Sequence, residues 1–117
     1  MEVFGANLSD EFRTCRAFGI RAGEKLKIER HTNSHQRMLT LNGDGSVFIL
    51  RDQGWKLCRQ HSGKEAPLEE KWVSIEPDLW HLPVGGPKGW IGLAFHTATQ
   101  EELIDDFSYT GTLPEGI

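Results

Sequence analysis

The sequence predicts an all-β protein, an antiparallel sandwich or barrel of short strands. Turn signals recur about every eight to twelve residues, and the segments between them carry strand-forming residues. All four tryptophans fall on or beside the expected strands, where their large side chains suit a half-buried pleated surface. At 117 residues the chain is long enough for one domain with a single core. We expect that domain to span 1–117, with its β core at 12–96.

The charge balance argues against two classes of partner. The net charge is −4, from 13 Lys and Arg against 17 Asp and Glu. Nucleic acids and anionic membranes both attract clustered positive charge, so we expect neither as a partner. The longest apolar runs are far shorter than a bilayer span, and residues 1–10 lack the apolar core of a signal peptide. These features predict a cytoplasmic protein.

Two cysteines, Cys15 and Cys58, lie on expected strands and belong to no CxxC motif. A disulfide between them is possible from the sequence, but two free, buried thiols are the favoured interpretation for an intracellular protein.

The first half of the chain divides into short extended segments. We expect a lead-in or edge strand over 1–11, then strands over 12–20, 24–31 and 36–41. Apolar and polar residues alternate through 24–31, the period of a half-buried strand. The run Asn42-Gly43-Asp44-Gly45 is the strongest hairpin signal in the chain, because these residue types tolerate positive φ.

The second half continues the pattern. Strands are expected over 46–51 and 55–59 with a hairpin at 52–54, then a mobile polar loop over 60–67. A buried strand within 71–76 ends at the turn formers Pro77 and Asp78, and His81 begins the next strand. The run 85–89 is expected to be a hairpin loop before a last strand over 90–96.

One short helix is expected over 99–107. Thr99 and Glu102 have the spacing of a capping box, in which each side chain bonds the other residue's backbone amide. Leu103, Ile104 and Phe107 would supply its apolar face. The tail after it, which is rich in glycine and proline, is expected to be loose or docked.

Candidate ligand residues recur at a regular spacing, G-x5-E-x-H-x4-Q-x6-G, from Gly23 to Gly43. Glu29 and His31 share one face of a strand because the side-chain period is two. Gln36, across a turn, can face the same cavity, and His81 arrives from a separate strand. Imidazole and oxygen donors converging in this way predict a site for a divalent transition metal. The alternative for Glu29, an exposed carboxylate paired with a neighbouring cation, has equal weight.

These two segments resemble the motifs of the cupin superfamily. The first cupin motif runs G-x5-H-x-H-x3,4-E-x6-G, and the second runs I-P-x-G-x-W-H, which Ile75-Glu76-Pro77-Asp78-Leu79-Trp80-His81 is similar to. The resemblance covers roughly 23–95 and implies a jelly-roll barrel whose ligands hold Fe, Mn, Ni or Zn. His31 and His81 match the family's ligands. Glu29 replaces a histidine and Gln36 a glutamate, so the resemblance implies an altered metal site.

The same resemblance implies a pocket beside the metal ligands, with Met38, Trp72 and Trp80 as walls. His96 ends the last strand and is expected either as a hydrogen-bonded structural residue or as part of that pocket. His35 and His61 are expected at the surface.

Within the superfamily, the sequence is similar to small cupins of the tellurite-resistance TehB type. This narrower similarity implies a small stress-linked cupin with no settled reaction. The cupin resemblance as a whole implies a metal-dependent oxygenase, isomerase or lyase acting on a small organic molecule. Two alternatives stay open at this point. One is a non-catalytic cupin that binds a sugar or organic acid, and the other is a structural homodimer, paired through edge strands, with a vestigial pocket.

Overall fold

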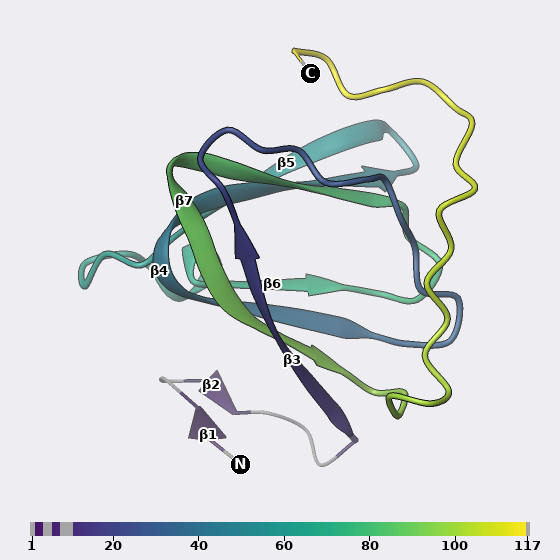
Figure 1. The fold of residues 1–117 in the computed structure, drawn as a ribbon, viewed down its shortest axis with the longest axis horizontal. Helices are drawn as coiled ribbons and strands as arrows, with labels where there is room; N and C mark the ends of the chain where they lie inside the picture. The colour runs from purple at the N-terminus through teal and green to yellow at the C-terminus, as the bar shows by residue number, and fades with distance from the viewer. Residues whose placement is uncertain (1, 4–5, 8–10, 117) are drawn as a thin grey trace.

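The computed structural model describes residues 2–3, 6–7 and 11–116 (Figure 1). Its elements are β1 (Glu2–Val3), β2 (Ala6–Asn7), β3 (Thr14–Ile20), β4 (Gln36–Arg51), β5 (Gly54–His61), the short 3-10 turn η1 (Leu68–Glu70), β6 (Trp72–Ile75) and β7 (His81–His96). β1 and β2 pair with each other, and the remainder of the lead-in expected over 1–10 lies outside the described residues.

Two long strands, β4 and β7, build both layers of the sheet. They pair antiparallel from Gln36↔His96 to Ile49↔His81, and both curve from one layer into the other (Figure 1). In one layer β3 and β6 flank this central pair, and in the other β5 lies beside β4. The all-β prediction is confirmed. The ladders of the described residues end at β3 and β5, so the barrel is not closed.

The hairpin expected at Asn42–Gly45 was wrong, because β4 continues through this run and only bends there. Gly43 has a φ of 76°, and a Cβ on it would lie 2.1 Å from the Gly89 carbonyl oxygen. A Cβ on Gly45 would lie 2.2 Å from the Trp90 ring. The glycines therefore serve a close approach between two strands, not a chain reversal.

The hairpin loop expected at 85–89 is likewise a bulge within a continuous β7. The pairing register shifts between Gly43 and Gly45 of β4, which face Trp90 and Gly85 of β7. More residues lie on the β7 side of this shift than on the β4 side, which bends the strand without reversing it.

The segment 24–31 is extended but is not the regular strand that its alternation predicted. It contacts β7 through isolated bridges, Lys25↔Val84 and Glu29↔His81. Between them lies Pro83, which has no N–H to donate, and the pairing register shifts by one residue between the two bridges. Glu29 and His31, two residues apart on this extended stretch, still face the same side.

The helix expected over 99–107 does not form. The amide of Leu103 donates to the Thr99 carbonyl, which completes one turn. The Ile104 amide, which would make the next hydrogen bond of a helix, instead donates to the Asn33 side-chain oxygen at 3.2 Å. Beyond it, Arg30 and Asp106 exchange both backbone hydrogen bonds, so the chain is extended there. Long-range partners therefore outcompete a helix too short to be stable by itself.

The main core lies between the layers. Its buried members are Ile20, Met38, Val47, Ile49, Val73, Ile75, Trp90 and Ala94. Trp90 is fully buried and donates its indole N–H to the Thr40 hydroxyl at 2.9 Å. Both cysteines are free, but Cys15 is exposed where a buried thiol was expected. Among the described residues, no helix has the length and apolar character needed to cross a membrane.

Candidate metal centre

A cross-strand pair, Glu29 and His81, forms the base of the site. Each donates its backbone N–H to the other's carbonyl oxygen, at 3.0 and 2.8 Å. Residues that exchange both bonds are directly opposite, so their side chains project from the same face. The Glu29 Oε1 atom lies 3.5 Å from the His81 Nε2 atom. The β6–β7 turn aims His81, with Asp78 in the left-handed region at φ 70°.

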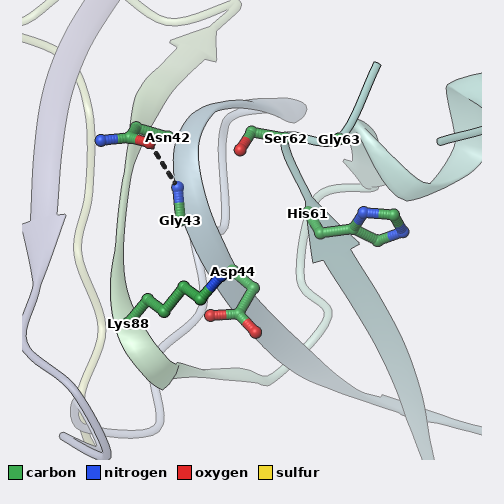
Figure 2. A pocket seen from close by; sticks show the side chains of 7 residues that line it. All are labelled: Asn42, Gly43, Asp44, His61, Ser62, Gly63 and Lys88. Atoms are coloured by element: carbon green, nitrogen blue, oxygen red, sulfur yellow. Dashed lines mark hydrogen bonds between the residues drawn. The ribbon is translucent and has the colours of Figure 1, made fainter. Parts of the chain in front are cut away.

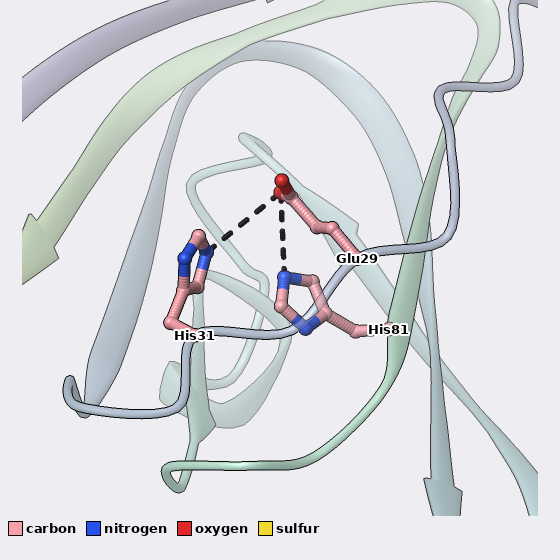
Figure 3. Close-up of side chains that lie close together, drawn as sticks. All are labelled: Glu29, His31 and His81. Carbon is pink, nitrogen blue, oxygen red and sulfur yellow. Dashed lines mark ion pairs between the residues drawn. The ribbon is translucent and has the colours of Figure 1, made fainter. Parts of the chain in front are cut away.

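His31 joins the pair from two residues along the chain. Its Nε2 atom lies 3.8 Å from Glu29 Oε1, and its ring centroid is 5.3 Å from that of His81. One ligand atom from each of Glu29, His31 and His81 lies within 4.8 Å of the others. Figure 3 shows both imidazoles directed at the carboxylate. The two predicted histidine ligands and Glu29 are thus brought together.

Backbone acceptors orient both imidazole rings. His81 Nδ1 lies 3.0 Å from the Leu79 carbonyl oxygen. His31 Nδ1 lies 3.2 Å from the Ile104 carbonyl oxygen and 3.0 Å from Asp105 Oδ1. Carbonyl and carboxylate oxygens can only accept, so each ring carries its proton on Nδ1. Both Nε2 lone pairs then face the Glu29 carboxylate, which is the arrangement of metal-binding histidines.

A cavity of about 150 Å³ lies beside these groups and is lined by Glu29 and His31. Gln36 and His96, opposite one another on β4 and β7, also line it, as does Met38. His96 is 2% exposed, and its Nδ1 lies 3.5 Å from the Ser34 hydroxyl. Gln36, Met38 and His96 are therefore at the cavity where the sequence placed them.

The two tryptophans expected in the pocket wall lie elsewhere. Trp72 packs in a second cluster with Leu39 and Phe95, because its neighbour Val73 takes the inward position on β6. Trp80 precedes the inward-facing His81 and so points to the opposite side, where its ring lies under the Arg30 guanidinium at 4.4 Å. Neither residue lines the 150 Å³ cavity.

The surroundings favour the charged form of Glu29 and the neutral forms of His31 and His96. Burial raises the pKa of Glu29, but the favourable electrostatic interactions with the surrounding imidazoles of His81, His31 and His96 outweigh it, and the net pKa is lowered. Burial lowers the pKa of His31 despite the opposing effect of Glu29. Burial, reinforced by the charge of His31, lowers the pKa of His96 to about 3. Neutral imidazole and ionised carboxylate are the forms that bind metals.

Three buried polar atoms at the site have no hydrogen-bond partner among the residues that the structure describes: His31 Nε2, His81 Nε2 and Gln36 Oε1. A buried polar atom without a partner is costly. All three atoms are electron-pair donors when the rings carry their protons on Nδ1. The donor set therefore fits a divalent transition metal, with Glu29 supplying the anionic ligand.

Two further charged residues at the site were missed by the sequence reasoning. Arg16 lines the cavity from β3. Arg16, Phe18 and Ile20 lie at successive intervals of two residues, so they face the same side of β3. The alternation of residues over 12–20 could therefore have indicated that Arg16 points inward. Asp105 contacts His31 from the C-terminal segment, and no local pattern indicates it.

The other two histidines, His35 and His61, lie away from the ligand group. His35 Nε2 contacts the Ser74 hydroxyl, and His61 Nε2 lies 3.4 Å from the Glu70 carboxylate.

A second hollow, of about 620 Å³, lies at the bend of β4 (Figure 2). Asn42 Oδ1 accepts the Gly43 amide there at 3.0 Å, and Asp44, His61 and Lys88 are among its lining residues. It shares no lining residue with the 150 Å³ cavity, so the metal-ligand group belongs to the smaller space.

No protein-family model and no curated protein matches the chain. Solved structures do match it. The recombinant pro-11S globulin of pumpkin aligns with a TM-score of 0.66 and 14% identity, over 80% of this chain and 22% of the globulin. The QdtA 3,4-ketoisomerase from Thermoanaerobacterium thermosaccharolyticum aligns with a TM-score of 0.62 and 14% identity, over 80% of this chain and 65% of the ketoisomerase.

The oxalate decarboxylase of Bacillus subtilis aligns with a TM-score of 0.61 and 15% identity, over 86% of this chain and 23% of the decarboxylase. The chain spans about a fifth of the length of the seed globulins it matches. Globulins and enzymes are both among these neighbours, so the likeness concerns the fold and not the activity. The similarity to the tellurite-resistance group stays a prediction. The chain has the cupin fold.

Proposed function

We propose that the chain is a metal-dependent member of the cupin superfamily that acts on a small organic molecule. Glu29, His31 and His81 would hold the ion, and the Gln36 amide oxygen would be a fourth donor. The observation that carries the proposal is the pair of imidazoles with Nδ1 tied to backbone carbonyls and Nε2 turned to one carboxylate. Orientation of this kind is typical of a ligand group supported by outer-shell partners.

Two imidazoles and one carboxylate favour Fe or Mn, and the same donors accept Ni or Zn. When bound, such an ion supplies a Lewis acid or activates oxygen. The cavity of about 150 Å³ is smaller than the pockets of drug-sized ligands, about 300–1,000 Å³. The substrate class that it suits is therefore a molecule of only a few non-hydrogen atoms.

The chain's own residues would then hold and enclose that molecule. Met38 and Ala94 form an apolar wall, which excludes water from one side of the cavity. His96, with a pKa of about 3, stays neutral at physiological pH and is a weak base. We therefore assign it to the cavity wall and not to proton transfer.

Metal analysis of protein purified without a nickel column tests the proposal. We expect about one equivalent of a transition metal after supplying Fe or Mn, and loss of that metal in both His31→Ala and His81→Ala. His61→Ala is the matched control, because His61 is 41% exposed and pairs with Glu70 away from the site. Less than about a tenth of an equivalent, with no gain on adding Fe, Mn, Ni or Zn, would sink the proposal. Metal retained in both site variants would show that the ligands are misassigned.

A second function, binding of a small molecule without turnover, is favoured by one observation. Glu29 and Gln36 share a small cavity with apolar residues in its wall, an arrangement that also suits a binding pocket. Metal-free protein that binds an organic acid or a sugar as tightly as metal-loaded protein would favour this function over the first.

A further inference from the structure

Arg16 is a cationic group on the inward face of β3. The burial of β3 alternates, and Arg16 shares the parity of Phe18 and of the buried Ile20. All three side chains line the cavity that holds Glu29, His31 and Gln36. The Arg16 side chain is 34% exposed, and a partly buried guanidinium beside the apolar Phe18 and Ile20 favours an anionic partner, because removing a charge from water is costly when it is unpaired.

The partners of Arg16 within the chain hold it but do not neutralise it strongly. Its Nε donates to Gln100 Oε1 at 3.1 Å, which is a neutral acceptor. Among the described residues, its nearest carboxylate oxygen, Asp105 Oδ2, lies 3.7 Å from Nη1, beyond the usual length of a charge-assisted hydrogen bond. The other oxygen of the same carboxylate lies 3.0 Å from His31 Nδ1. Asp105 thus lies between the guanidinium and a candidate metal ligand.

The charges of the cavity favour an anionic ligand. The Arg16 guanidinium and a divalent ion would carry three positive charges against the two carboxylates of Glu29 and Asp105, so one positive charge would be left for a ligand to balance. A guanidinium also presents two parallel N–H groups that match the two oxygens of a carboxylate.

We propose that Arg16 makes this cavity a site for a small carboxylate, whose anionic group is bound by the guanidinium beside the metal ligands. The inference deepens the proposed function and rests on it for the part played by the metal. The competing role for Arg16 is purely structural: through Gln100 and Asp105 it would only fasten the C-terminal segment to β3.

Acetate, with acetamide as its uncharged analogue, and Co²⁺ as a visible-absorption probe test the proposal. In wild-type protein loaded with Co²⁺, acetate should shift the absorption bands and acetamide should have little effect. Arg16→Gln should weaken acetate at least about tenfold, the loss expected for one charge-assisted hydrogen bond, and Arg16→Lys should restore part of it. Co²⁺ affinity itself should be unchanged, which shows that the variants are folded at the site.

Arg51→Gln is the matched control, since Arg51 also pairs with one carboxylate, Glu76, and is similarly exposed. It should bind acetate as the wild type does. Equal acetate affinity in wild type and Arg16→Gln would overturn the proposal and leave the metal site intact. If the role of Arg16 is only to hold the C-terminal segment against β3, Arg16→Gln and Asp105→Asn would lower the melting temperature by similar amounts and leave acetate affinity unchanged.

Acetate is also titrated into metal-free protein and followed by amide chemical shifts of the cavity-lining residues. If Co²⁺ does not bind the wild type, the proposed function fails. Acetate shifts that depend on Arg16 would then still support the carboxylate site, and their absence would overturn it as well.

Discussion

His31 Nδ1 lies 3.0 Å from the carboxylate oxygen of Asp105, and this contact joins the first half of the chain to its C-terminal segment. The same nitrogen lies 3.2 Å from the Ile104 carbonyl. The segment after β7 therefore supplies the partners that fix the tautomer of a candidate metal ligand. Figure 1 shows this segment running along one side of the two layers, next to the chain that carries His31.

Asp105→Asn should weaken metal binding about tenfold, because partners of this kind are worth about 10–100-fold in affinity and asparagine keeps one acceptor oxygen. Titration with Co²⁺ measures the change. Asp52→Asn, in the exposed β4–β5 turn, is the control and should bind as the wild type does. Unchanged affinity in Asp105→Asn would show that the Ile104 carbonyl alone suffices to orient His31.

Gly45→Ala should destabilise the fold by about 1–3 kcal/mol, since the new methyl group would overlap the buried Trp90 ring, whose nearest atom lies 2.2 Å from the Cβ position. Gly19→Ala is the matched control: no atom lies within 4 Å of its Cβ position. Its stability should change little. Urea unfolding of the two variants measures the difference, and equal midpoints would contradict the close approach at the β4 bend.

Metal-free protein should lose stability as the pH falls from about 6.5 toward 3. In the unfolded chain His96 is protonated below its ordinary pKa of 6.5, whereas burial lowers the folded pKa to about 3. Between these values the unfolded state binds more protons, so the free energy of unfolding falls by up to about 1.4 kcal/mol per pH unit for this group. Stability from this source is complete above pH 6.5.

His96→Gln should therefore flatten that part of the pH profile, whereas His61→Gln, at a 41% exposed position, should follow the wild type. Urea unfolding at a series of pH values gives both curves. Parallel curves for wild type and His96→Gln would show that His96 is not the group responsible.

Asn33→Ala should loosen the C-terminal segment. The Asn33 amide donates to the Glu102 carbonyl at 2.7 Å, and its oxygen accepts the Ile104 amide at 3.2 Å. Loss of both bonds should cost about 1–2 kcal/mol and accelerate hydrogen exchange at the Ile104 amide. Asn42→Ala removes one local bond to the next residue and should leave that exchange unchanged. Unaltered exchange in Asn33→Ala would mean that the Arg30–Asp106 pairing holds the segment by itself.

Sequence reasoning located most of the strands and six residues of the candidate site. The parity of Glu29 and His31, and the motif spacing to Gln36 and His81, hold even though the segment 24–31 is not a regular strand. Side-chain direction depends on extended backbone, not on a complete ladder, so local alternation was sufficient. The hairpin of β4 and β5 at 52–54 was predicted for the same local reason, and Gly54 has the positive φ that it needs.

Other features were not accessible from local patterns. Glycines at Asn42–Gly45 indicate that positive φ or a close neighbour is required, but the same residues serve a turn or a bend. Trp72 and Trp80 could have faced either side until the register of β6 and β7 was known.

By itself, the sequence determined which segments are extended and which side chains share a face, because both follow from backbone geometry over a few residues. Only the tertiary structure decided that β4 bends at Gly43, that 99–107 is drawn into extended pairing, and that Arg16 and Asp105 meet beside His31. Those outcomes depend on hydrogen bonds and packing between residues far apart in the chain, where a long-range partner outweighs a local preference of a few tenths of a kcal/mol to about 1 kcal/mol per residue.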